Sequence, residues 1–167
     1  ERERIVAALS WGAATISSSR FRFEIKLGKR IVQKSKRLAE EANTPYCLGI
    51  AALGEASSSF CTGEFRKGKT AASLADQHFR EGCTGVTWER DSSQMFHNWS
   101  LMFLGEYAEL TAFAEAAVFD AREHGNVYAA TTNAVFALAL ARLAGGDPDG
   151  AQAGMDENMA NWPSSVY

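Results

Sequence analysis

The sequence predicts an all-α fold of about eight helices arranged as four helical hairpins. Apolar residues recur at helical spacing, as in Met95, Trp99 and Met102, and no segment reads as a credible strand. The tripeptide "GEF" at Gly63 returns as "GEY" at Gly105 and as "GDP" at Gly146, spaced 42 and 41 residues apart. Small-residue helices that repeat with such a period are typical of stacked hairpins, each of which buries its neighbour's apolar face.

The first two hairpins are predicted over residues 1–43 and 44–83. In the first, helices are expected at about 1–18 and 24–42, and "NTP" at 43–45 separates it from the second. Gly63 is expected to form the bend of the second hairpin, whose last helix ends at Gly82.

The third and fourth hairpins are predicted over 86–125 and 126–162. Gly105 forms the third bend and Gly125 is expected as a helix C-cap. The apolar stripe before Gly105 comprises Met95, Phe96, Trp99, Met102 and Phe103. In the fourth hairpin, "GGDPDG" is the bend, with Pro148 at the start of the last helix.

Length and composition bound the class of protein. The chain has 167 residues, 46% hydrophobic and 22% charged, which is typical of a single globular domain over 1–167. No run approaches 18 consecutive apolar residues, so no membrane segment is expected, and the N-terminal segment does not resemble a signal peptide. Three cysteines without ligand spacing predict small buried, reduced thiols. The first methionine is Met95, so we expect a fragment of a longer protein.

The segment "GEFRKGKT", Gly63–Thr70, satisfies the phosphate-binding pattern G-x-x-x-x-G-K-[ST]. A nucleotide loop follows a buried strand, but "GEASSSFCT" ahead of it has no Val/Ile run. The equivalent bend at Gly105 carries no Gly-Lys pair. We therefore expect an interhelical turn with Phe65 as a packing aromatic, and Lys67 and Lys69 on or near the solvated side.

The order of helix, Gly-x-aromatic and second helix resembles the tetratricopeptide repeat. The resemblance implies a solenoid curved into a right-handed superhelix. Gly68 and Leu110 depart from it, because that family usually has Ala there, and the units exceed its usual length. "FREGCTGVTWERDSSQMFHNWSLMFLGEYAEL" and "AREHGNVYAATTN" are similar to the helical-repeat region of large bacterial serine/threonine protein kinases.

This second resemblance implies a cytoplasmic parent that phosphorylates Ser/Thr with ATP and magnesium. The chain itself lacks the Gly-rich loop, His-Arg-Asp and Asp-Phe-Gly of a kinase domain, so neither catalysis nor a cofactor is expected within it. Its three histidines lie on different predicted helices without ligand spacing, and no metal site or catalytic constellation is expected.

In tetratricopeptide arrays the first helix of each hairpin lines a peptide-binding groove. By register from the three glycine bends, the resemblance implies groove positions at Ser57, Phe60, Met95, Trp99, Phe136 and Leu140. The alternative is that these side chains form the core.

Charge is unevenly distributed along the chain. Residues 1–90 carry 15 Lys+Arg and 10 Asp+Glu, and residues 91–167 carry 2 and 10. Lys26, Arg30, Lys34 and Arg37 are predicted to share one helix face. A solvated face, an acidic protein partner and the acidic half of a second copy are all compatible with it. Nucleic acid is disfavoured by the pI of 5.7 and because no exposed aromatics interleaved with the cations are evident.

The expected function is protein–protein interaction, as a regulatory or scaffolding region of a kinase, with possible self-association. Three alternatives stay open: a ligand-sensing region of a bacterial transcription regulator, an ATP-dependent enzyme using Gly63–Thr70, and a nucleic-acid binder using residues 20–37.

Overall fold

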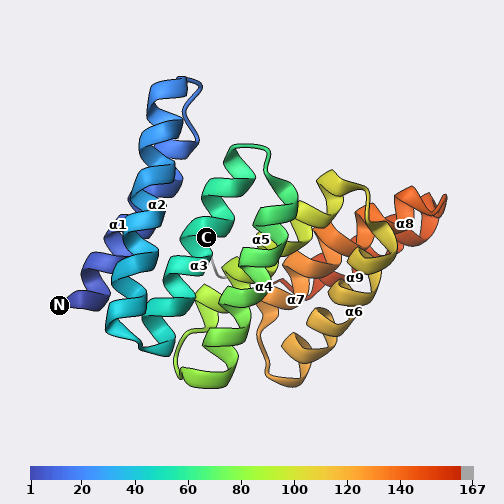
Figure 1. Cartoon of the computed structure of the whole chain (residues 1–167). Coiled ribbons are helices and arrows are strands. Elements are labelled where there is room, and N and C mark those ends of the chain that lie inside the picture. The colour runs from blue at the N-terminus through green and yellow to red at the C-terminus, as the bar shows by residue number, and fades with distance from the viewer. Residues whose placement is uncertain (163–167) are drawn as a thin grey trace. The chain divides into compact units, whose positions relative to one another are not determined.

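The computed structural model describes residues 1–162, in which all regular structure is helical (Figure 1). No strand occurs among these residues, which confirms the predicted all-α class. The elements are α1 (Arg2–Ser17), α2 (Arg22–Ala42), α3 (Pro45–Cys61), α4 (Phe65–Gly82), α5 (Thr87–Leu104), α6 (Tyr107–Glu123), α7 (Val127–Thr132), η1 (Asn133–Leu138), α8 (Ala139–Ala144) and α9 (Pro148–Ala160).

The chain divides into two compact units, and the boundary falls within α5. Unit 1 is Glu1–Ser100 and unit 2 is Leu101–Tyr167.

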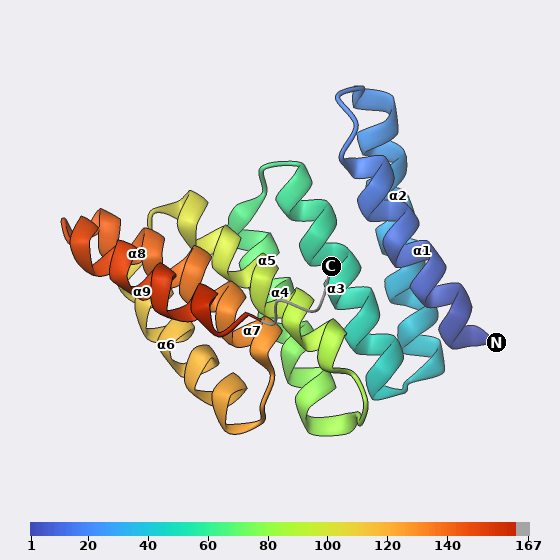
Figure 2. The same ribbon diagram turned by 180° about the vertical axis from the view of Figure 1, so that it is seen from behind.

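In unit 1, α3 is the central helix and packs against α1, α2 and α4 (Figure 2). Thr44 caps it by accepting a hydrogen bond from the Cys47 N–H, and Pro45 begins it. All of residues 49–59 are buried. Small residues allow this, because a Cβ at Gly54 would lie 2.6 Å from the Cβ of Ser10 on α1. The backbones of α1 and α3 therefore touch directly.

Four bends between helices share one hydrogen-bond pattern. At Gly63, the glycine N–H donates to the carbonyl of Phe60 and the following Glu64 N–H donates to that of Ser59. This is the Schellman arrangement, and its glycine takes the left-handed conformation that other residues avoid. The same two bonds occur at Gly105, Gly125 and Gly146, and φ at the four glycines is 76°, 73°, 67° and 81°.

These bends confirm the equivalence predicted from the sequence for Gly63, Gly105 and Gly146, and the C-cap predicted at Gly125. The prediction for Gly82 is only half right. α4 does end there, but the left-handed glycine is Gly85, at φ 72°. Gly82 instead makes a close approach, because a Cβ on it would lie 2.4 Å from the Cβ of Pro45.

The helices α2, α4 and α6, each the second helix of a predicted hairpin, bury the same register. Its buried positions include four spaced by four, three and four residues: Gly28, Val32, Ser35 and Ala39 on α2; Gly68, Ala72, Ala75 and Phe79 on α4; Leu110, Ala114, Ala117 and Ala121 on α6. Gly68 and Leu110, which depart from the tetratricopeptide pattern, thus occupy the same buried position as Gly28.

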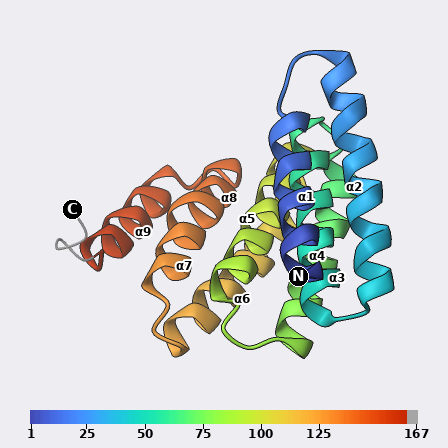
Figure 3. The same cartoon turned by 90° about the vertical axis from the view of Figure 1, so that its left-hand side faces the viewer.

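In unit 2, α7, η1 and α8 follow one another without a break and pack between α6 and α9 (Figure 3). Asn126 caps the start by accepting from the Ala129 N–H. η1 is a six-residue π-helix, and the buried Asn133 at its start donates its side-chain amide to the carbonyl of Ala129. Leu101, Leu110 and Ala114 form the core of this unit with Ala137 and Ala141.

By length and composition alone, the helical segment Val127–Ala144 is apolar enough to cross a membrane. In the structure, 44% of this segment is buried inside the protein.

Two expectations about burial are wrong. Phe103, predicted within the apolar stripe, is 56% exposed. Of the thiols predicted to be buried, Cys47 is buried but Cys61 is exposed.

Candidate functional site

Two predicted groove residues of unit 1, Phe60 and Trp99, form an aromatic cluster with Phe96 at the edge of the core. The ring centroids of Phe60 and Trp99 are 5.3 Å apart, and those of Phe96 and Trp99 are 5.6 Å apart. Phe60, Met95 and Trp99 are partly buried and pack against the unit 1 core. Ser57 is buried. Three of these four side chains therefore combine core contacts with some exposed surface.

The predicted groove positions of unit 2 are more open. Phe136 lies in the π-helix and is 59% exposed, and Leu140, one turn later, is 37% exposed. Leu143 continues the series at 51% exposed and was missed by the prediction, although its spacing from Phe136 is helical. Together, Phe136, Leu140 and Leu143 form an apolar strip that solvent reaches on one helix.

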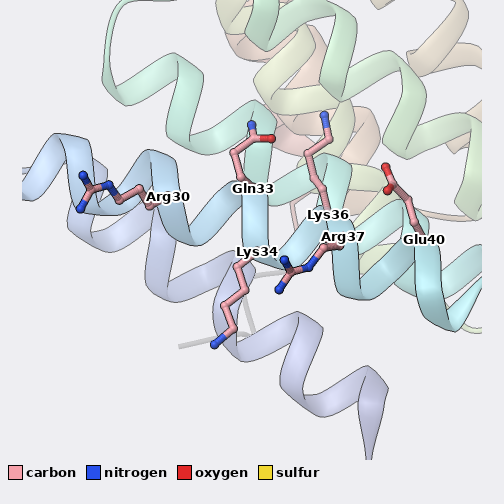
Figure 4. Close-up of a pocket in the computed structure, with 6 residues that line it drawn as sticks. All are labelled: Arg30, Gln33, Lys34, Lys36, Arg37 and Glu40. Carbon is pink, nitrogen blue, oxygen red and sulfur yellow. The ribbon is translucent and has the colours of Figure 1, made fainter.

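The structure places Lys26, Arg30, Lys34 and Arg37 on the exposed side of α2, as predicted. Arg30, Lys34 and Arg37, with Gln33, Lys36 and Glu40, line an open depression of about 630 Å³. In Figure 4, Gln33, Lys36 and Glu40 extend to one side of α2 and Lys34 to the other. Arg37 lies 3.8 Å from Glu41, but within residues 1–162 no acid pairs with Lys26, Arg30 or Lys34.

A buried carboxylate connects this helix with its neighbours. Glu55 on α3 has only 9% of its side chain exposed and lies between Lys36 of α2, at 2.5 Å, and Lys67 of α4, at 3.0 Å. Burial alone would raise the pKa of Glu55, but the hydrogen bonds and charges of the two lysines outweigh this effect and lower it. One acid therefore holds α2, α3 and α4 together. Sequence reasoning missed it, because its partners lie on other helices.

The segment Gly63–Thr70 has the structure of a turn and a helix start. α3, not a strand, precedes it, and α4 begins at Phe65. The Phe65 ring packs against Phe60 at 5.7 Å between centroids, as predicted. Lys67 is 48% exposed but pairs with Glu55, and the Thr70 hydroxyl donates to the carbonyl of Arg66. Of the side chains that the pattern specifies, Thr70 thus makes a contact within α4, and the neighbouring Lys67 makes a contact between helices.

One expectation about the basic segment is wrong. No exposed aromatics were expected near it, yet Phe21 is 64% exposed and Phe23 is 75% exposed, beside Arg20 and Arg22. The buried side of α2 carries Gly28, Val32, Ser35 and Ala39, and a helical projection places Phe23 opposite that side. Leu27, one turn later, is 37% exposed.

Unit 2 also contains a small cavity of about 290 Å³ between α6, α7 and α9. Its polar lining comes from Arg122, Asn126, Thr131, Asn158 and Asn161. The Arg122 guanidinium donates to the side-chain carbonyl of Asn158 at 2.9 Å. Asn158 and Asn161 donate their side-chain amides to the α9 carbonyls of Gly154 and Glu157, so much of this polar lining is engaged in contacts within the protein.

Comparison with protein-family models, curated proteins and solved structures finds no match to this chain.

Proposed function

We propose that this chain is a protein-binding module built from tetratricopeptide-like helical hairpins that stack into a right-handed superhelix. It acts as a regulatory or scaffolding region of a large cytoplasmic bacterial serine/threonine protein kinase. In this proposal, ATP and magnesium belong to a kinase domain elsewhere in the parent, and this chain has no catalytic role.

One observation carries the proposal: the bends at Gly63, Gly105 and Gly146 have the same pair of hydrogen bonds and are spaced 42 and 41 residues apart. Together with the common buried register of α2, α4 and α6, they support a repeated unit of two helices. Units of this kind use their first helices for binding in the tetratricopeptide arrays that the sequence resembles. An array with exposed apolar side chains on such a helix fits the binding of an extended peptide or a partner helix.

The exposed apolar strip of unit 2 supplies that surface. Phe136 and Leu140 are predicted groove residues, and both are exposed, together with Leu143. Aromatic and aliphatic anchors contribute most of the affinity at protein interfaces, so Phe136 is the expected hot spot.

A peptide library displayed on phage and selected against residues 1–167 tests the proposal. We expect the selected peptides to bind with an apolar anchor, and Phe136→Ser to weaken binding by about tenfold or more. Phe119→Ser is the matched control, because Phe119 is 68% exposed on α6, the second helix of its pair. Both variants should change the free energy of unfolding by less than about 0.5 kcal/mol.

The proposed binding surface is wrong if no peptide is selected, or if the two variants weaken binding equally. The kinase assignment is tested separately, by reading the coding sequence on both sides of this segment. His-Arg-Asp and Asp-Phe-Gly motifs in the same reading frame would support it, and their absence from the parent would refute it.

A further inference from the structure

The turn that joins α1 to α2, with the first residues of α2, carries exposed apolar side chains. We call residues 18–27 the hairpin tip. It contains Phe21, Phe23 and Leu27, of which Phe21 and Phe23 are among the most exposed large apolar side chains described. Within unit 1, this tip projects beyond the turn between α3 and α4 in Figures 1, 2 and 3. Exposed aromatic side chains at a projecting end do not pack within the unit, and such apolar patches are typical of contact sites for a partner protein or a membrane.

The tip is also strongly cationic. Arg20, Arg22 and Lys26 stand in it, and Glu24 is its one acid. The Ser19 hydroxyl donates a hydrogen bond to the Glu24 carboxylate. Within residues 1–162, no acid pairs with Arg20, Arg22 or Lys26, so their charge faces solvent. Apolar and cationic side chains at one end are the two contributions that hold a protein reversibly at an anionic lipid surface.

The order of the apolar and cationic side chains along α2 indicates which end of the helix would face a lipid surface. Phe23 comes first, Lys26 follows about 4–5 Å behind it and Arg30 about 10 Å behind it, at about 1.5 Å per residue. The acids Glu40 and Glu41 lie at the opposite end of the helix. An interfacial apolar group enters the headgroup and acyl boundary by about 5–10 Å, which places the following cations at the level of the lipid phosphates.

The same order argues against nucleic acid as the occupant. Proteins that bind single strands place aromatic side chains along a basic track, so that successive bases stack beside successive phosphates. Here the exposed aromatics of α2 and its preceding loop are confined to the tip, and the face that continues through Arg30, Lys34 and Arg37 carries none.

We infer that the hairpin tip docks end-on to a membrane surface rich in anionic phospholipid. Phe21, Phe23 and Leu27 enter the interface, and Arg20, Arg22 and Lys26 contact the lipid phosphates. Attachment is peripheral and reversible, because three apolar side chains bury less surface than a single acyl anchor, which itself binds only marginally.

Cosedimentation of the 167-residue chain with vesicles tests the inference. Vesicles of one part phosphatidylserine to two parts phosphatidylcholine should bind the chain, and pure phosphatidylcholine vesicles should bind it far more weakly. The double variant Phe21→Ser/Phe23→Ser should weaken binding by about tenfold or more. Arg22→Glu/Lys26→Glu should weaken it by about 25-fold or more, since each cation contributes about fivefold.

Two control variants test whether binding depends on the tip itself or on any exposed phenylalanine or cation of the chain. Phe119→Ser removes an equally exposed phenylalanine in unit 2 and should leave vesicle binding unchanged. Arg37→Glu alters a cation about 20 Å behind Phe23, beyond the screening length at physiological salt, and should change binding by less than about twofold. All the substituted side chains are exposed, and circular dichroism should show unchanged helix content.

The inference is overturned if phosphatidylserine vesicles do not bind the chain. It is equally overturned if the double phenylalanine variant binds them as the native chain does, or if Arg37→Glu is as damaging as Arg22→Glu/Lys26→Glu. Tip-dependent binding of an oligothymidylate strand in place of vesicles would assign the surface to nucleic acid instead.

Discussion

Removing both lysine partners of Glu55 should strongly destabilise unit 1. Lys36→Met/Lys67→Met keeps much of the apolar length of the two side chains but leaves a carboxylate that is only 9% exposed without a counter-charge. An uncompensated buried charge costs about 3–5 kcal/mol. The lysine side chains are 36% and 48% exposed, so water reaches the edges of the site, and we expect a loss near the lower end, about 3 kcal/mol at pH 7.

The pH dependence of that loss identifies its cause. In the native chain the pKa of Glu55 is lowered, so its contribution to stability is present above its ordinary pKa and is lost as pH falls through the folded-state pKa. In the double variant only burial acts, so the pKa of Glu55 is expected to rise. Its penalty should then disappear as the carboxyl is protonated on acidification. The difference in unfolding free energy between the two proteins should therefore shrink as pH falls from 7 toward 4.

Urea denaturation followed by tryptophan fluorescence measures the effect, because three of the four tryptophans, Trp11, Trp88 and Trp99, lie in unit 1. Adding Glu55→Gln to the double variant removes the stranded charge and should recover a large part of the lost stability. A loss below about 1 kcal/mol, or a loss that does not vary with pH, would refute the argument that Glu55 is a buried charge compensated by two lysines.

Three further predictions follow from unit 1. Trp99→Ala should lower the free energy of unfolding by about 2–3 kcal/mol, because its ring packs on Phe60 while remaining partly exposed; a change below about 0.5 kcal/mol would assign Trp99 to an open groove. Gly63→Ala should cost about 1–2 kcal/mol in urea denaturation because φ is 76°, whereas Gly12→Ala, in a helix with open space at its Cβ, should be neutral or stabilising by up to about 1 kcal/mol. Isothermal titration with Mg·ATP should show no binding at Gly63–Thr70, and binding that Lys69→Ala abolishes would restore the phosphate-loop interpretation.

Local signals in the sequence were enough to predict the helices and bends. A glycine at 63, 105, 125 or 146 follows a helix-length segment, and the Schellman bonds that each one makes join residues at most five positions apart. The caps are equally local, since Thr44 and Pro45 begin α3 and Asp147 accepts from the Gly150 N–H to begin α9. Helix caps and bends are determined by residues within about one turn of each other, so a short stretch of sequence is enough to predict them.

The missed features depend on residues far apart in the chain. Glu55 looked like one more charge in an Ala/Ser-rich segment, and its partners Lys36 and Lys67 are brought to it only by the packing of α2 and α4 on α3. Phe23 was a different kind of miss. A helical projection of α2 places Phe23 opposite the buried side, beside the cations, so the sequence does contain a local signal for its exposure.

The shared bend bears on how a chain of this kind varies in evolution. The hydrogen bonds that end α3 and start α4 all join residues between Ser58 and Gly68, so the reversal of chain direction is encoded within that short stretch. A duplicated or deleted segment that carries two helices and one such stretch already contains all the residues that form its bend. A gene rearrangement that moves such a segment would add or remove a helix pair without requiring a new bend, and only the newly apposed helix faces would need to adapt.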